Sequence, residues 1–216
     1  MTISEANQQL LFTLYHDYDN REAASIADWL MENLTGWQKI DRIINKQIRL
    51  STSQETALRQ FLEQLEMHVP VQYILHEAWF CGMKLYVDEN VLIPRPETEE
   101  LVEWIITSFP SDQIKVIDIG TGSGCIAIAL KKKNRAMEVY ACDISDAALE
   151  VARKNATAQE VEINFIQADI LDAAQWGKLP SADLIGPCPA RVPASRRVRT
   201  TNAHRARKQT GLGQNT

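Results

Sequence analysis

Residues 116–130 read VIDIGTGSGCIAIAL, an apolar run that ends in three alternating glycines and continues into a second apolar run. Glycine reaches backbone conformations closed to other residues, so Gly120, Gly122 and Gly124 let the chain turn tightly and approach a ligand. The first run is typical of a buried strand, and the second of a helix whose free N–H groups point at the turn. A strand, a glycine turn and a helix in this order predict a ligand site at the strand end.

The alternation of strand and helix continues on the C-terminal side of this turn. Apolar strands are predicted at KVIDIG, EVYACD, INFIQAD and ADLI, separated by helices at about 124–133, 145–157 and 171–176. Apolar strands that alternate with helices predict an α/β fold with a parallel sheet covered on both faces. Binding sites in such sheets lie at the C-terminal ends of the strands.

The glycine spacing distinguishes two cofactor classes. Dinucleotide folds have a G-x-G-x-x-G turn, whereas this turn is G-x-G-x-G with Asp118 two residues before its first glycine, which disfavours NAD. Asp143 ends the next strand, where a carboxylate can accept hydrogen bonds from both hydroxyls of a ribose. Asp169 ends the third strand, placed for an adenine amino group, with Ile170 beside it as an apolar wall for the ring. The alternative for these three residues is an ordinary solvated strand end.

The N-terminal third has a different pattern. Apolar residues recur at helical spacing between residues 4 and 67, Ile40, Ile43 and Ile44 among them, with breaks near 19–20, 35–36 and 51–53. Pro70 ends this pattern. Residues 79–94 then alternate as in a β-hairpin, and a helix follows over 95–106.

Composition and charge narrow the class of protein. The chain has 216 residues, 45% of them hydrophobic and 24% charged, and shows neither a signal peptide nor a long apolar run. Four dispersed cysteines and four histidines predict a reduced, cytoplasmic, metal-free protein. Residues 1–183 hold 16 basic against 28 acidic residues, so this part of the chain disfavours nucleic acid as a partner.

Three stretches carry a resemblance to a known family: PVQYIL at 70–75, VLIPRPETEELVEWI at 91–105 and the glycine turn. Together they resemble the protein-(glutamine-N5) methyltransferases that modify peptide chain release factors, and the likeness runs from about residue 70 to 185. The resemblance implies a class I, Rossmann-like fold and S-adenosylmethionine as cofactor. It implies cofactor-binding roles for Gly120, Thr121, Gly122, Ser123, Gly124, Asp143, Asp169 and Ile170.

The resemblance also divides the chain. It implies a helical substrate-recognition domain over 1–70, a β-hairpin linker over 71–94, a partial S-adenosylmethionine-binding domain over 95–185 and a disordered, non-family tail over 186–216. His76 stands where the family has glycine, so we expect a strained backbone there. The implied activity is methyl transfer to the side-chain amide of the glutamine in a release factor's Gly-Gly-Gln loop.

One motif of the family is missing. An Asn-Pro-Pro-Tyr turn should follow the fourth strand, because an amide nitrogen, with its lone pair delocalised, reacts only when acceptors hold its hydrogens in place. These positions hold Cys188, Pro189, Ala190 and Arg191 instead, so no catalytic residue is assigned. Residues 184–216 hold seven basic residues and no acidic one. Residues 186–216 show no apolar periodicity, which indicates a truncated or frameshifted C-terminal part that lacks the last strands. We therefore expect little or no activity.

Two other functions stay open from the sequence. Adenine and RNA methyltransferases share the cofactor turn and a related proline-containing motif, and the basic tail would favour them. A non-catalytic fragment that binds a release factor through its helical domain is the second alternative.

Overall fold

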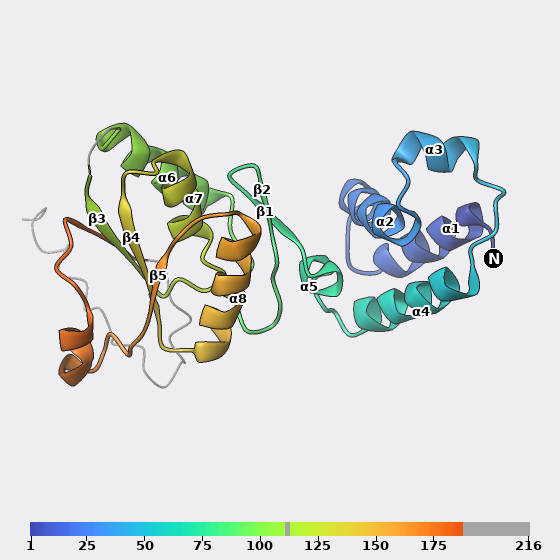
Figure 1. Ribbon diagram of the computed structural model, residues 1–216. Helices are drawn as coiled ribbons and strands as arrows, with labels where there is room; N and C mark the ends of the chain where they lie inside the picture. Colours follow the sequence, from blue (N-terminus) through green and yellow to red (C-terminus); the bar gives the residue numbers. More distant parts are fainter. Residues whose placement is uncertain (111–112, 188–216) are drawn as a thin grey trace, which may run out of the picture.

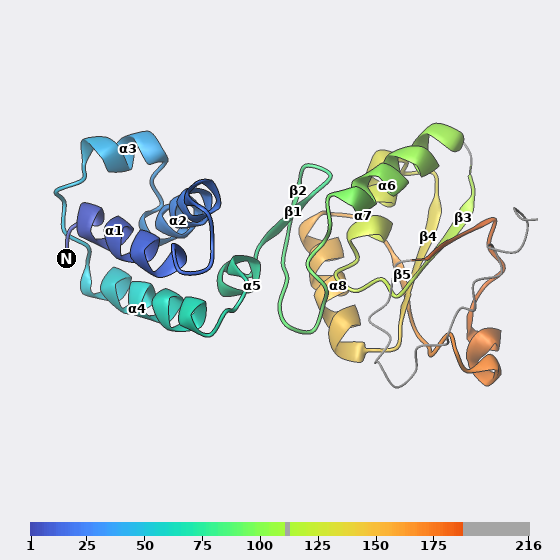
Figure 2. The same ribbon diagram turned by 180° about the vertical axis from the view of Figure 1, so that it is seen from behind.

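The structure is a computed structural model, and it describes residues 1–110 and 113–187. Two bodies lie side by side in Figures 1 and 2, a bundle of helices and a sheet with helices packed on it. A short helix and a β-hairpin lie between the two bodies. This arrangement confirms the predicted order of a helical N-terminus, a hairpin and a parallel sheet.

Four helices form the N-terminal bundle: α1 (Ile3–Leu14), α2 (Asn20–Thr35), α3 (Lys39–Ile44) and α4 (Thr52–Glu66). Apolar residues of α1, α2 and α4 share one core, in which Leu10, Leu30 and Leu58 are almost fully buried. The bundle thus has an apolar core of its own.

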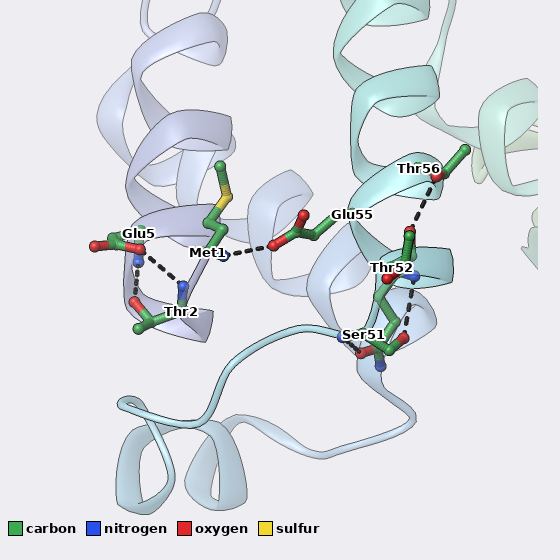
Figure 3. Close-up of polar contacts among 8 residues, drawn as sticks. Met1, Thr2, Glu5, Ser51, Thr52, Glu55 and Thr56 are labelled. Atoms are coloured by element: carbon green, nitrogen blue, oxygen red, sulfur yellow. Dashed lines mark hydrogen bonds and ion pairs between the residues drawn. The ribbon is translucent and has the colours of Figure 1, made fainter.

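Side-chain caps fix where these helices begin. Thr2 and Glu5 form a reciprocal capping box at the start of α1 (Figure 3). Ser51 forms one with Gln54 at the start of α4. The Met1 amine lies 2.5 Å from Glu55 Oε1 and joins the two helix starts. The predicted breaks near 19–20 and 51–53 are confirmed, with Asp19 as the cap of α2.

Helix α3 packs differently from the way its sequence suggests. Its isoleucines Ile40, Ile43 and Ile44 are exposed, and the buried residue is Arg42. Arg42 donates hydrogen bonds to the Trp37 carbonyl at 2.6 Å and to Asp28 Oδ1 at 2.9 Å. A buried cation needs such partners, and they turn the apolar side of α3 outward.

The connecting segment contains α5 (Val71–Leu75), β1 (Ala78–Phe80) and β2 (Met83–Leu85). Val71 and Ile74 pack into the core of the bundle, and the two strands pair antiparallel around Cys81–Gly82. The hairpin is therefore shorter than the predicted 79–94, because residues 86–94 run as a loop. His76 caps α5 with φ 51°, which confirms the expected strain.

The sheet has the order β5-β4-β3-β6 and is parallel throughout. Its strands are β3 (Lys115–Ile119), β4 (Glu138–Asp143), β5 (Asn164–Gln167) and β6 (Leu184–Pro187). The helices that accompany them are α6 (Glu97–Ser108), α7 (Cys125–Lys133), α8 (Asp146–Ala158) and the 3-10 helix η1 (Ala173–Lys178). This is the predicted α/β topology, with the first strand of the sheet paired to the fourth.

The two faces of the sheet are covered unequally in the described part of the chain. Helices α7 and α8 lie on one side and η1 on the other in both views of the molecule. The second face carries Ile117, Cys142 and Ile166, and beyond the strands it is packed by Leu179 and Ala182 near η1. The sequence predicted helices on both faces, but on the second face few residues outside the strands pack against the sheet in the described part of the chain.

The boundary of the tail needs one correction. Gly186 and Pro187 belong to β6 and pair with Asp118 and Ile119, whereas we expected them in a disordered tail. The rest of the predicted tail, 188–216, lies outside the described residues. Within 1–110 and 113–187, every helix is too short or too polar to span a bilayer.

Candidate functional site

A cavity of about 240 Å³ lies at the C-terminal ends of β3 and β4. Three segments line it: the loop and first turn of α6 between 90 and 98, the turn between 120 and 125, and the strand end between 143 and 148. This is the edge of a parallel sheet at which ligands bind. The sequence predicted the second and third segments.

The glycine turn is built on three left-handed residues. Gly120, Gly122 and Gly124 have φ of 72°, 54° and 79°. The N–H groups of Gly120 and Thr121 both donate to the carbonyl of Cys142, at 2.7 and 3.0 Å, which holds the turn against the end of β4. A Cβ at Gly122 would meet no atom within 4 Å, and Gly122 is one of the residues that line the cavity.

Asp143 ties two of the cavity segments together. Its Oδ2 accepts a hydrogen bond from the Gly122 N–H at 3.0 Å, and its Oδ1 accepts one from the Ser145 N–H at 3.0 Å. A carboxylate has about four acceptor positions, so each oxygen can still accept a bond from a ligand. The structure thus brings the predicted turn and the predicted carboxylate to one cavity.

Asp118 lies behind the turn and is 1% exposed. Burial raises its pKa to about 6, against the lowering effects of the Thr121 hydroxyl and the Ala127 N–H, and nearby Asp143 raises it further. Its Oδ2 accepts from Thr121 Oγ1 at 2.7 Å, while Oδ1 has no partner of hydrogen-bonding geometry in the described part of the chain. Asp118 therefore supports the turn from within the protein.

The third wall, residues 90–98, was not predicted. It brings the exposed Leu92, the exposed cation Arg95 and the hydroxyl of Thr98 to the cavity. Ile144, 57% exposed, contributes an apolar surface next to Asp143. Periodicity could not find the wall formed by 90–98, because it reaches the turn through contacts between residues that are distant in the sequence. For Ile144 there was a usable signal, an isoleucine directly after the acid that ends a strand.

Three predicted residues are not part of the cavity lining. Gly124 lies behind the turn, against α8. Asp169 Oδ1 accepts from the Leu171 N–H at 2.9 Å, and the Ile170 carbonyl accepts from Trp176 Nε1 at 2.9 Å. The roles of Asp169 and Ile170 toward an adenine ring remain predictions. The positions of the missing motif, 188–191, lie outside the described residues.

The strand order, the glycine turn and the acid at the end of the next strand define the Rossmann-like fold of class I methyltransferases. Residues 98–185 match the model of the methyltransferase small domain, and residues 12–75 match that of the PrmC N-terminal domain.

The chain is similar in sequence to proteins named release factor glutamine methyltransferase. It is 42% identical over 175 residues to the enzyme of that name from Flavobacterium psychrophilum, covering 79% of this chain and 61% of the relative. It is 45% identical over 152 residues to that from Streptococcus pneumoniae, covering 68% of this chain and 53% of the relative. The chain thus spans between half and two thirds of the length of these relatives.

Solved structures are more distant. A Pyrococcus abyssi tRNA (uracil-54, C5)-methyltransferase in complex with S-adenosyl-L-homocysteine matches 50% of this chain and 26% of its own, at 20% identity and a TM-score of 0.40. The fold assignment rests on the strand order and turn described above.

Proposed function

We propose that the cavity at the ends of β3 and β4 binds S-adenosylmethionine. The observation that carries the proposal is the hydrogen bond between Asp143 and Gly122, which brings the glycine turn and the strand-end carboxylate to one site. Once bound, this cofactor supplies a methyl group activated by its sulfonium.

The chemistry of the lining fits this ligand. Asp143 keeps acceptor positions for the two ribose hydroxyls, and Ile144 offers an apolar face to the adenine ring. Arg95 provides a cation for the carboxylate of the methionine part. The open space beside Gly122 allows the ligand to approach the backbone.

The substrate follows from the family. We infer that the chain derives from enzymes that methylate the side-chain amide of the glutamine in a release factor's Gly-Gly-Gln loop, and that the helical bundle, with its own apolar core, contacts the release factor. Release factors are therefore the proposed protein partner and the cytoplasm the proposed location.

Transfer by this chain should be at background. A glutamine amide needs acceptors that orient its two N–H bonds toward the methyl group. The residues at the family's Asn-Pro-Pro-Tyr positions are Cys188, Pro189, Ala190 and Arg191, and neither a thiol nor a guanidinium supplies a carbonyl acceptor. We thus propose that this chain retains the cofactor site but lacks the carbonyl acceptors that would hold the glutamine amide.

A methyl-transfer assay tests this proposal. The chain and the full-length relative from Flavobacterium psychrophilum are each incubated with radiolabelled S-adenosylmethionine and a release factor. We expect label on the release factor from the relative, and counts at the no-enzyme level from this chain. Transfer by this chain at the rate of the relative would overturn the second half of the proposal.

The binding-module alternative has structural support in the bundle's separate core. A pull-down of a release factor with the 216-residue chain, in the absence of cofactor, tests it. Retention on the chain favours a binding role, and no retention above the bare resin excludes it.

A further inference from the structure

Asn155 on α8 is a buried polar side chain whose hydrogen bonds all go to the backbone of two other segments. It is 1% exposed. Its Nδ2 donates to the carbonyls of Tyr86 and Ser123, both at 2.9 Å, and its Oδ1 accepts from the Tyr86 N–H at 2.7 Å. These three bonds link α8, the exit of the hairpin and the glycine turn.

The chemistry of the amide matches this task. A carboxamide has two N–H donors and a carbonyl acceptor, and here both donors and the acceptor are used. The Tyr86 N–H can only donate, so it fixes which of the two terminal atoms of the amide is the oxygen. A buried amide that lost these partners would be strongly destabilising, so each of the three contacts contributes to stability.

The two segments that Asn155 joins lead to two different walls of the cavity. Ser123 belongs to the turn that forms one wall. Tyr86 begins the loop that reaches the other wall at Val91 and Arg95, and this loop packs on α8 through Val87 and Val91. Asn155 does not line the cavity, yet it connects both walls to one rigid helix.

The same loop is held from the side of the helical bundle. The His76 ring stacks on Tyr86 with a centroid distance of 5.3 Å, and its Nδ1 lies 3.2 Å from the Val87 carbonyl. The Tyr73 hydroxyl donates to the Val91 carbonyl at 2.7 Å. Contacts from the bundle side and from Asn155 therefore hold the same loop, and Tyr86 takes part in both.

We propose that Asn155 is a positioning residue, which keeps the two walls of the cavity at the spacing that the methyl donor requires. The inference rests on the proposed cofactor site. Its consequence is energetic coupling between the cavity and the hairpin exit, and such coupling is reciprocal. Ligand binding must then slow opening at Tyr86, and removal of the Asn155 amide must weaken binding.

The test combines calorimetry with residue-resolved amide hydrogen exchange on the 216-residue chain, with S-adenosylhomocysteine as the probe. In the wild type we expect the ligand to slow exchange of the Tyr86 amide. In Asn155→Ala we expect a loss of affinity of about tenfold, within the usual range of coupling between sites. We also expect the ligand to have no effect on Tyr86 in this variant. Met137→Ala is the control, because Met137 is fully buried just before β4, at the opposite end of the sheet.

Three results overturn the inference: Tyr86 exchange that the ligand leaves unchanged in the wild type, Asn155→Ala with wild-type affinity, or the same loss of affinity in Met137→Ala. Asn155→Leu, which keeps the number of side-chain heavy atoms and removes the same bonds, replaces the alanine variant if that variant does not fold. If the wild type binds no ligand, the cofactor proposal fails separately. Hydrogen exchange of the Gly122 amide without ligand then tests whether Asn155 holds the glycine turn. This exchange must be faster in the Asn155 variant than in Met137→Ala.

Discussion

The glycine turn packs so closely on α8 that a Cβ at Gly124 would lie 3.1 Å from the Cβ of Ala152. Gly122, two residues earlier, also has a positive φ, but a Cβ there would meet no atom within 4 Å. The two glycines thus have different structural roles. Gly124 allows the turn to approach the helix, and Gly122 keeps the cavity side of the turn open.

Alanine at these two positions should therefore have different effects. Gly124→Ala combines a left-handed backbone with overpacking and should lower the free energy of unfolding by about 2–4 kcal/mol. Gly122→Ala has only the backbone cost, about 1 kcal/mol, but should weaken the binding of S-adenosylhomocysteine. Urea unfolding and calorimetry measure the two quantities. Equal stability losses in the two variants would contradict the assignment.

Asp118 should make stability depend on pH. Its folded pKa is raised from 3.8 to about 6, so its contribution to stability is fully present below about pH 4 and is lost as the pH rises through 6. The amide that replaces the carboxyl group in Asp118→Asn carries no charge at any pH. The free energy of unfolding of this variant, relative to wild type, should therefore rise by up to about 3 kcal/mol between pH 4 and pH 7.

Asp146→Asn is the matched control for this titration, because the Asp146 side chain is 65% exposed. Its stability relative to wild type should change little over the same pH range. A flat profile for Asp118→Asn as well would show that the pKa of Asp118 is not raised in the folded protein.

His76 combines strain with useful contacts, and two substitutions separate them. Its left-handed φ of 51° has a cost that glycine would relieve, while its ring contributes the Tyr86 stack and the bond to Val87. His76→Ala keeps the strain and loses the contacts, whereas His76→Gly loses both. We expect His76→Gly to be more stable than His76→Ala by about 1 kcal/mol in urea unfolding. The reverse order would mean that the backbone at 76 relaxes out of the left-handed region.

Local sequence signals predicted much of this fold. The glycine turn and Asp143 were found because a strand end and a turn are contiguous features. The helix breaks near residues 19–20 and 51–53 were found because a break in an apolar pattern depends on a few neighbouring residues. The parallel sheet was predicted from the alternation of apolar strands with helices. These elements depend on interactions within short stretches, which is why one sequence was enough.

The features that were missed depend on contacts between distant residues. Asn155 looks like any polar residue on α8 until Tyr86 and Ser123 are brought to it. Residues 90–94 were predicted as the end of a hairpin, and instead they belong to a loop that forms a wall of the cavity. Arg42 took the buried side of α3 because Asp28 lies opposite, so the apolar pattern of that helix was misleading.

The central claim is that Asp143 and the glycine turn form one methyl-donor site, and titration calorimetry with S-adenosylhomocysteine tests it most directly. The wild-type chain and Asp146→Asn should show one saturable site of the same affinity. Asp143→Ala, which removes the acceptor for Gly122 and for the ribose, should bind at least about tenfold more weakly, the loss expected for charge-assisted hydrogen bonds. No saturable heat from the wild type, or an unchanged dissociation constant in Asp143→Ala, would contradict the account.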